Sequence, residues 1–203
     1  MRKIYFPLFF LLFLVNFSAF AKNSCSSLLF EATAWVPSAT ILGTTEVCQG
    51  SGPQQITFTG SGGTAPYTFT YKINNGTTNH TVTTTSGNSV TINVSSNNAG
   101  IFEYSLVSVI DSATDATQET ATGSATITVN ALPVITGDNA LCVGTTTDLD
   151  GSGQQAPNPA WSSSNPAVAT VNNAGIVDAQ APGTTTITYT NSNGCQETKV
   201  ITV

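Results

Sequence analysis

Apolar and polar residues alternate in short runs along most of this chain. The clearest run is 67–73, Tyr-Thr-Phe-Thr-Tyr-Lys-Ile, in which three aromatic residues and an isoleucine occupy every second position. A period of two places these side chains on one face of a β-strand. Further runs with strand character cover 56–59, 90–94, 101–110, 123–129, 142–149, 168–171, 176–177, 184–190 and 199–203, with Trp161 after a Pro-rich loop. No window carries a convincing i, i+3, i+4, i+7 apolar stripe, so the pattern predicts an all-β fold.

Turn residues separate these runs at intervals of about 8–12 residues, which is typical of β-sandwiches. The clearest turns are 60–63 (Gly-Ser-Gly-Gly), 74–76 (Asn-Asn-Gly) and 97–100 (Asn-Asn-Ala-Gly). Residues 130–133 (Asn-Ala-Leu-Pro) have the character of a tight junction. We therefore predict two tandem β-sandwich domains, one on each side of that junction, and each is long enough for one core.

The first 42 residues have a different pattern. Arg2 and Lys3 precede an apolar run, 4–15, and the segment closes on Ala-Phe-Ala at 19–21. This order predicts a secretory signal peptide, residues 1–21, that is cleaved after Ala21. The alternative is an uncleaved membrane anchor, for which the apolar run is short. Residues 22–42 are predicted to form a lead-in that packs on the first domain. The mature chain is then expected to be secreted or displayed on the cell surface, without a membrane span.

Charge and composition exclude several functions. The chain has 5 Lys+Arg, 11 Asp+Glu and 1 His among 203 residues, with a formal net charge of −6. So few cations exclude an electrostatic nucleic-acid binder, and a single histidine excludes a multi-histidine metal site. That histidine, His80, lies in a Thr-rich strand and no Gly-x-Ser-x-Gly motif is present. We therefore predict that the chain is not an enzyme and uses no cofactor.

The four cysteines, Cys25, Cys48, Cys142 and Cys195, allow three pairings in an exported protein. Cys142 starts the first strand region of the second domain, and Cys195 directly precedes its last strand. Because the first and last strands of a sandwich commonly lie close together, the sequence predicts a Cys142–Cys195 disulfide. Cys25 and Cys48 then remain, either as a pair that ties the lead-in to the first domain or as two free thiols.

The second half of the chain carries a specific motif. Residues 161–171 read Trp-Ser-Ser-Ser-Asn-Pro-Ala-Val-Ala-Thr-Val, and Gly-Ile-Val follows at 175–177 and Pro-Gly-Thr-Thr-Thr-Ile-Thr at 182–188. This pattern resembles the bacterial Ig-like domain of group 2. The resemblance implies an Ig-like β-sandwich over 131–203 in which Trp161 fills the core between the sheets.

The first half, 43–130, resembles the PKD-like repeats of large surface proteins from gliding bacteria. The resemblance rests on Val-Cys-Gln at 47–49, Gly-Thr-Ala-Pro-Tyr-Thr-Phe-Thr-Tyr at 63–71 and Gly-Ile-Phe-Glu-Tyr at 100–104. It implies a second Ig-like sandwich. Those repeats often have another cysteine shortly before the last strand, and residues 115–122 contain none. Cys48 thus lacks its family partner, which leaves room for Cys25.

By resemblance, such modules are spacers and adhesive repeats of cell-surface proteins that are exported by the type IX secretion route. We expect a non-catalytic structural or adhesive module, an N-terminal fragment of a longer adhesin of the gliding-motility-associated type. The expected partners are neighbouring repeat domains of the same chain, with surface glycans or other cells as further candidates. The alternative is a carbohydrate-binding accessory region of a secreted hydrolase.

One candidate glycan site lies on the aromatic strand. Tyr67, Phe69 and Tyr71 share one face, and flat rings on a sandwich surface can stack against sugars. The competing interpretation, which the pattern favours, is that this most apolar face of the strand points into the core.

Two other candidate sites have weak support. Asp148 and Asp150 offer carboxylate oxygens of the kind that calcium binds, but the run lacks the further acids of a dedicated calcium loop, so a solvated loop is favoured. Ser112, within Asp-Ser-Ala, matches a short acceptor pattern that resembles the one used for O-glycans in this bacterial group. No metal site is predicted beyond the calcium candidate.

Overall fold

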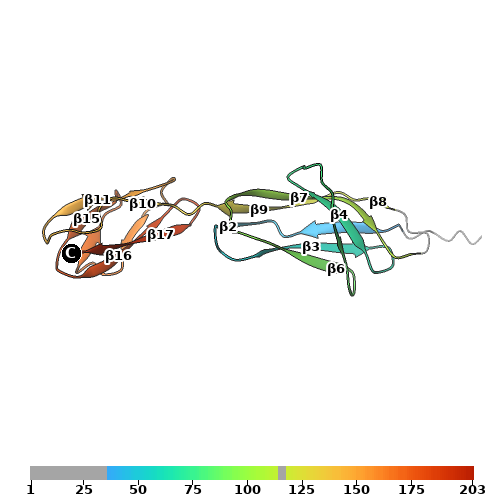
Figure 1. Cartoon of the computed structure of the whole chain (residues 1–203), viewed down its shortest axis with the longest axis horizontal. Coiled ribbons are helices and arrows are strands. Elements are labelled where there is room, and N and C mark those ends of the chain that lie inside the picture. The colour runs from blue at the N-terminus through green and yellow to red at the C-terminus, as the bar shows by residue number, and fades with distance from the viewer. Residues whose placement is uncertain (1–35, 114–117) are drawn as a thin grey trace, which may run out of the picture. The chain divides into compact units, whose positions relative to one another are not determined.

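The computed structural model describes residues 36–113 and 118–203, and all of its regular elements there are β-strands (Figure 1). The all-β fold class is therefore confirmed. The predicted signal peptide and Cys25 lie outside the described residues.

Two sheets enclose the first of two hydrophobic cores. One sheet has the strand order β1-β3-β6 and the other the order β2-β9-β7-β4-β5, with β8 paired to β7. The strands are β1 (Ser38–Leu42), β2 (Thr45–Cys48), β3 (Gln54–Ser61), β4 (Thr68–Ile73), β5 (His80–Thr83), β6 (Ser89–Val94), β7 (Gly100–Ile110), β8 (Glu119–Thr120) and β9 (Ser124–Asn130).

Alternation along these strands builds that core. In β3, Ile56 and Phe58 are fully buried while the threonines between and after them are only half-buried. Phe58 stacks on Phe69 of β4 with 5.6 Å between ring centroids and lies 5.0 Å from the ring of Tyr71. Aromatic side chains from the two facing sheets thus fill the space between them.

Three small sheets surround the second core. Their strand orders are β13-β16-β17, β11-β15-β14 and β10-β12. The strands are β10 (Ile135–Thr136), β11 (Thr146–Asp148), β12 (Asp150–Gly151), β13 (Trp161–Ser163), β14 (Ala169–Val171), β15 (Ile176–Ala179), β16 (Thr184–Thr190) and β17 (Gln196–Thr202). Trp161 is buried 4.6 Å from Tyr189 between ring centroids, in the core position that the Ig-like resemblance implied.

The serines that follow Trp161 build a hydroxyl network. Thr185 is buried, and its Oγ1 accepts a hydrogen bond from the Asn165 amide at 2.9 Å and shares another with Ser163 Oγ at 2.9 Å. Ser163 Oγ also donates to the carbonyl of Ala169 at 2.7 Å. These bonds fix the turn between β13 and β14, because they satisfy polar groups that the turn would otherwise bury.

The N-terminal edge of the first core differs from our expectation. Residues Ser38–Leu42, which we placed in the lead-in, form β1 and pair antiparallel with β3 over the full length of the strand. Ile41 of β1 is buried in the first core. The lead-in is therefore shorter than we predicted, since its last five residues are part of the sandwich.

Ionisation of buried tyrosines should weaken the first core at alkaline pH. Burial raises the pKa of Tyr71, and burial together with the neighbouring Tyr71 raises the pKa of Tyr104. The phenols of the unfolded chain ionise near pH 10. In the folded chain, Tyr71 and Tyr104 stay protonated to a higher pH. Stability from these groups is complete below about pH 10 and is lost as the pH rises through the folded pKa values.

We therefore expect the urea midpoint of the first core to fall between pH 8 and pH 10.5, and to fall less in the Tyr104→Phe variant. An equal fall in both proteins would show that ionisation of Tyr104 does not destabilise the first core. The pH range is kept short so that the disulfide survives.

Candidate functional site: the Cys48–Cys195 crosslink

The first half of the site lies where the chain leaves the first core. β2 runs parallel to β9, and their register sets Cys48 opposite Asn130, the last residue of β9. The Gln49 amide continues this pairing by donating to the Asn130 carbonyl at 2.8 Å. The strand pairing therefore holds Cys48 beside the start of residues 131–133, the part of the predicted 130–133 junction that follows β9.

The second half is the hairpin turn between β16 and β17. Asn191 is buried, and its Oδ1 accepts hydrogen bonds from the amides of Asn193 at 3.1 Å and Cys195 at 3.0 Å. Gly194 adopts a φ of 78° in this turn. Cys195, only 1% exposed, is thereby fixed immediately before the last strand.

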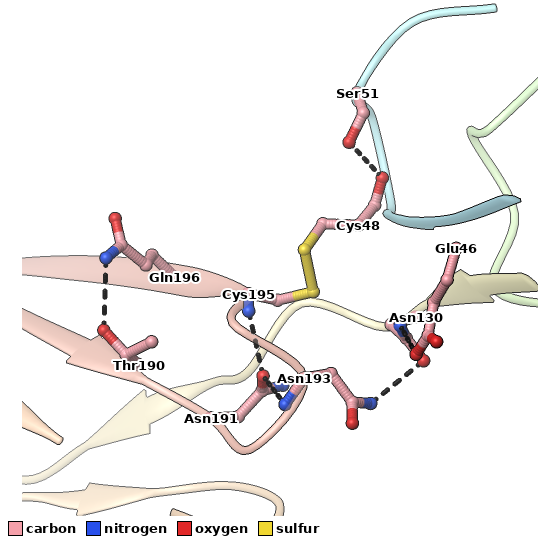
Figure 2. Close-up of a disulfide and its surroundings, with 9 residues drawn as sticks. All are labelled: Glu46, Cys48, Ser51, Asn130, Thr190, Asn191, Asn193, Cys195 and Gln196. Atoms are coloured by element: carbon pink, nitrogen blue, oxygen red, sulfur yellow. Dashed lines mark hydrogen bonds between the residues drawn. A yellow bond between two sulfur atoms is a disulfide. The ribbon is translucent and has the colours of Figure 1, made fainter. Parts of the chain in front are cut away.

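A disulfide joins these two positions (Figure 2). Cys48 and Cys195 have Cα atoms 5.6 Å apart and are separated by 147 residues in sequence. Beside the disulfide, Asn193 Nδ2 donates to Asn130 Oδ1 at 2.9 Å, and Asn130 Nδ2 donates to Glu46 Oε1 at 2.8 Å. Figure 2 shows this hydrogen-bonded row next to the sulfur atoms. The crosslink therefore connects the sandwich around the first core to the sandwich around the second.

Our predicted Cys142–Cys195 pair is wrong. Residue Ala140 bridges Thr202 in a parallel sense, so the chain reaches Cys142 at the C-terminal end of β17, whereas Cys195 precedes its N-terminal end. Seven strand residues span about 23 Å, and a disulfide needs Cα atoms within about 7 Å. Cys142 is an exposed free thiol. The Cys25–Cys48 alternative is also wrong for Cys48, which is bonded to Cys195.

The aromatic strand faces inward. Tyr67 and Phe69 are fully buried, and Tyr71 is 9% exposed. The core interpretation thus agrees with the structure, and the sugar-stacking platform on these three residues is wrong. His80 is half-buried and stacks on Tyr71, with ring centroids 5.4 Å apart, so its apolar ring face covers the edge of the core.

The other candidate residues lie apart from the crosslink. Ser112 is exposed, and its hydroxyl donates to the carbonyls of Thr64 at 3.1 Å and Ala65 at 2.8 Å. Its glycosylation stays a prediction. Asp148 ends β11 and Asp150 begins β12, both exposed. Among the described residues, no group of three or more His, Cys, Asp or Glu side chains could hold a metal ion, so nothing in this part of the chain strengthens the calcium candidate.

The described part of the chain is thus an all-β protein of two Ig-like sandwiches joined by a disulfide. Residues 133–203 match the family described as the bacterial Ig-like domain (group 2). This match confirms the resemblance for the second half of the chain. The PKD-like resemblance of the first half stays a prediction. No curated protein matches the chain.

Solved structures share the fold. A C-terminal 282-residue fragment of intimin, in complex with the intimin-binding domain of the translocated intimin receptor, aligns with a TM-score of 0.53 and 20% identity. The alignment covers 82% of this chain and 64% of the intimin fragment. A Ca²⁺-stabilized adhesin that helps an Antarctic bacterium bind ice aligns with a TM-score of 0.44 and 15% identity, over 80% of this chain and 47% of the adhesin. At its level of identity, the intimin likeness shows the Ig-like fold.

Within residues 36–113 and 118–203, no helix is long and apolar enough to cross a membrane.

Proposed function

We propose that this chain is a non-catalytic structural or adhesive module of a secreted or cell-surface bacterial protein, built to carry tension between its two ends. One observation carries the proposal: the Cys48–Cys195 disulfide links the two sandwiches across the 131–133 junction. A load that enters through β1 and β2 reaches Cys48, crosses the sulfur–sulfur bond and leaves through β17. Both cores lie largely outside this path.

Several features support export and surface display. Stable disulfides form in oxidising compartments outside the cytoplasm, and the N-terminal sequence has the order of a signal peptide. The proposal includes a domain division at 130/131 and export by the type IX route. It also includes a gliding-motility context and a larger adhesin of which this chain would be a part. Neighbouring repeat domains remain the expected partners.

The carbohydrate-binding alternative has no structural observation in its favour. Its three candidate aromatic side chains are buried in the first core. A glycan array with the purified full chain separates the two functions, because specific binding to any glycan would favour the accessory-region alternative.

The export part of the proposal can be tested through the redox state of the cysteines. Bacteria would produce the full chain and a variant that lacks residues 2–21, and free thiols would be alkylated before lysis. Peptide mapping without reduction should then find Cys48 linked to Cys195 in the full chain, and both alkylated in the shortened variant. Cys142→Ser serves as the matched control, since it should leave the linkage intact. Alkylation of Cys48 and Cys195 in the full chain would overturn the proposal.

A further inference from the structure

The turn that holds Cys48 occurs a second time in the chain. In Cys48-Gln49-Gly50-Ser51, the Ser51 amide and hydroxyl both donate to the Cys48 carbonyl, and Gly50 has a φ of 79°. In 142–145 (Cys-Val-Gly-Thr), the Thr145 amide and hydroxyl both donate to the Cys142 carbonyl, and the glycine has a φ of 78°. The hydrogen bonds donated by the Ser51 and Thr145 amides measure 3.2 and 3.1 Å.

Each turn also follows a segment that pairs in parallel with a stretch containing the sequence Ile-Thr-Val. β9 contains Ile-Thr-Val at 127–129, and the chain repeats this tripeptide at 201–203. Glu46 pairs in parallel with Thr128, and Ala140 pairs in parallel with Thr202. Strand pairing and sequence therefore give one register, in which Cys142 corresponds to Cys48 and Val203 corresponds to Val129.

This register defines what lies opposite each cysteine. Cys48 faces Asn130, the residue that follows the repeated tripeptide, and from there the chain passes to the sandwich that supplies Cys195. Cys142 faces the position that would follow Val203. Cys142 is exposed and free, and the neighbouring Val143 is 53% exposed. The second turn thus has the geometry of the first without its sulfur partner.

We propose that Cys142 is the attachment point for a further Ig-like module that continues from the strand ending at Val203. Its sulfur forms a disulfide with the cysteine in the turn before the last strand of that module, the equivalent of Cys195. This inference rests on the proposed function, because it extends the Cys48–Cys195 crosslink to the next junction. The partner is recognised by position: a cysteine in a β-hairpin turn that precedes the final strand.

Formation of this bond requires an oxidant, which we take to be a disulfide-bearing oxidoreductase of the export compartment. The Cys142 thiolate attacks one oxidant sulfur and forms a mixed disulfide, and one oxidant thiolate leaves. The thiolate of the module's cysteine then attacks Cys142 Sγ and releases the second oxidant thiolate. Two protein thiols lose two electrons and two protons, and the oxidant disulfide becomes a dithiol.

The test extends the full chain by one module. A second copy of residues 130–203 is appended after Val203. It begins with Asn130, so an asparagine occupies the position opposite the original Cys142. The appended copy alone carries Cys142→Ser. We expect two linkages in peptide maps without reduction: Cys48–Cys195, and Cys142 with the appended copy of Cys195. Alkylation of Cys142 should be at least tenfold lower than in the unextended chain.

A matched control carries Cys195→Ser in the appended copy, which should restore full alkylation of Cys142. Intrinsic tryptophan fluorescence would check that both copies of Trp161 are buried in each protein. Free Cys142 in an extended chain that has formed Cys48–Cys195 would overturn the inference and leave the proposed function standing. A Cys142–Cys142 dimer would also overturn it. Absence of the Cys48–Cys195 bond would overturn both.

Discussion

Stretching the oxidised chain between its two ends should produce almost no lengthening from residues 49–194. The disulfide joins Cys48 directly to Cys195, which are separated by 147 residues in sequence. The chain between them therefore bears no load while the bond is intact. After reduction, unfolding of both cores should release about 500 Å, because an extended chain spans about 3.3–3.6 Å per residue. Single-molecule force spectroscopy with and without a reductant measures this difference.

The oxidised chain should still lengthen slightly under force, because some strands lie outside the crosslink. Force reaches Cys48 through β1 and β2, and it leaves Cys195 through β17. Residues outside the crosslink can detach from their neighbouring strands, so short extensions from the N-terminal and C-terminal strands are expected. These events are far shorter than the release that follows reduction, and they should occur with equal size in both redox states.

Two variants make the stretching experiment specific. The double variant Cys48→Ala/Cys195→Ala should release the full length without a reductant, whereas Cys142→Ser should behave like the parent chain. Full lengthening of the oxidised parent would mean that the bond does not carry the load, and the proposed mechanical role would fail.

Much of the fold could be predicted because alternation dominates its longer strands. In β4, Phe69 and Tyr71 are buried between half-buried neighbours, and in β16 every second residue from Thr185 to Tyr189 is buried. The aromatic and aliphatic residues of both strands follow the same period in the sequence. The shorter β1 and β2 escaped prediction. β1 buries only Ile41 and leaves Leu42 67% exposed, so its sequence resembles a loop with scattered apolar residues. Its strand character comes from pairing with β3, which is a long-range contact.

The crosslink could not be predicted by treating each half of the chain separately. We paired Cys142 with Cys195 on the assumption that a disulfide closes a single sandwich. The actual partner of Cys195 follows from the parallel pairing of β2 with β9, because only this pairing brings Cys48 to the exit of the first sandwich. A repeated signal was nevertheless present in the sequence: Cys-x-Gly-Ser at 48–51 and Cys-x-Gly-Thr at 142–145. Aligning the two halves on it marks the cysteines as equivalent positions of consecutive modules.

Adding one methyl group at Gly60 should destabilise the first core by about 3 kcal/mol, at the upper end of the cost of overpacking. A Cβ on Gly60 would lie 2.5 Å from Cγ of Tyr67, which is far inside van der Waals contact. Tyr67 is 1% exposed, and its hydroxyl accepts a hydrogen bond from the Gly63 amide at 3.1 Å, so the ring is held at both ends. Gly60→Ala therefore forces the backbone of β3 and the ring apart.

The second core contains the same arrangement. A Cβ on Gly151 would lie 2.5 Å from the ring of Tyr189, whose hydroxyl donates to the Gly153 carbonyl at 3.2 Å. Gly151→Ala should thus destabilise the second core by a similar amount. Trp161 packs against Tyr189, so its fluorescence reports the unfolding of that core. Calorimetry of the oxidised chain reports both cores together.

A double-mutant cycle separates the steric clash from other effects of removing a glycine. Without the ring, in a Tyr67→Ala background, Gly60→Ala should no longer destabilise the chain. It should instead stabilise it by about 0.5–1 kcal/mol, because alanine loses less backbone entropy than glycine when it enters a strand. The sign of the Gly60→Ala effect thus depends on Tyr67. If the substitution costs the same free energy of unfolding with and without the ring, contact between Gly60 and Tyr67 is not what requires glycine at this position.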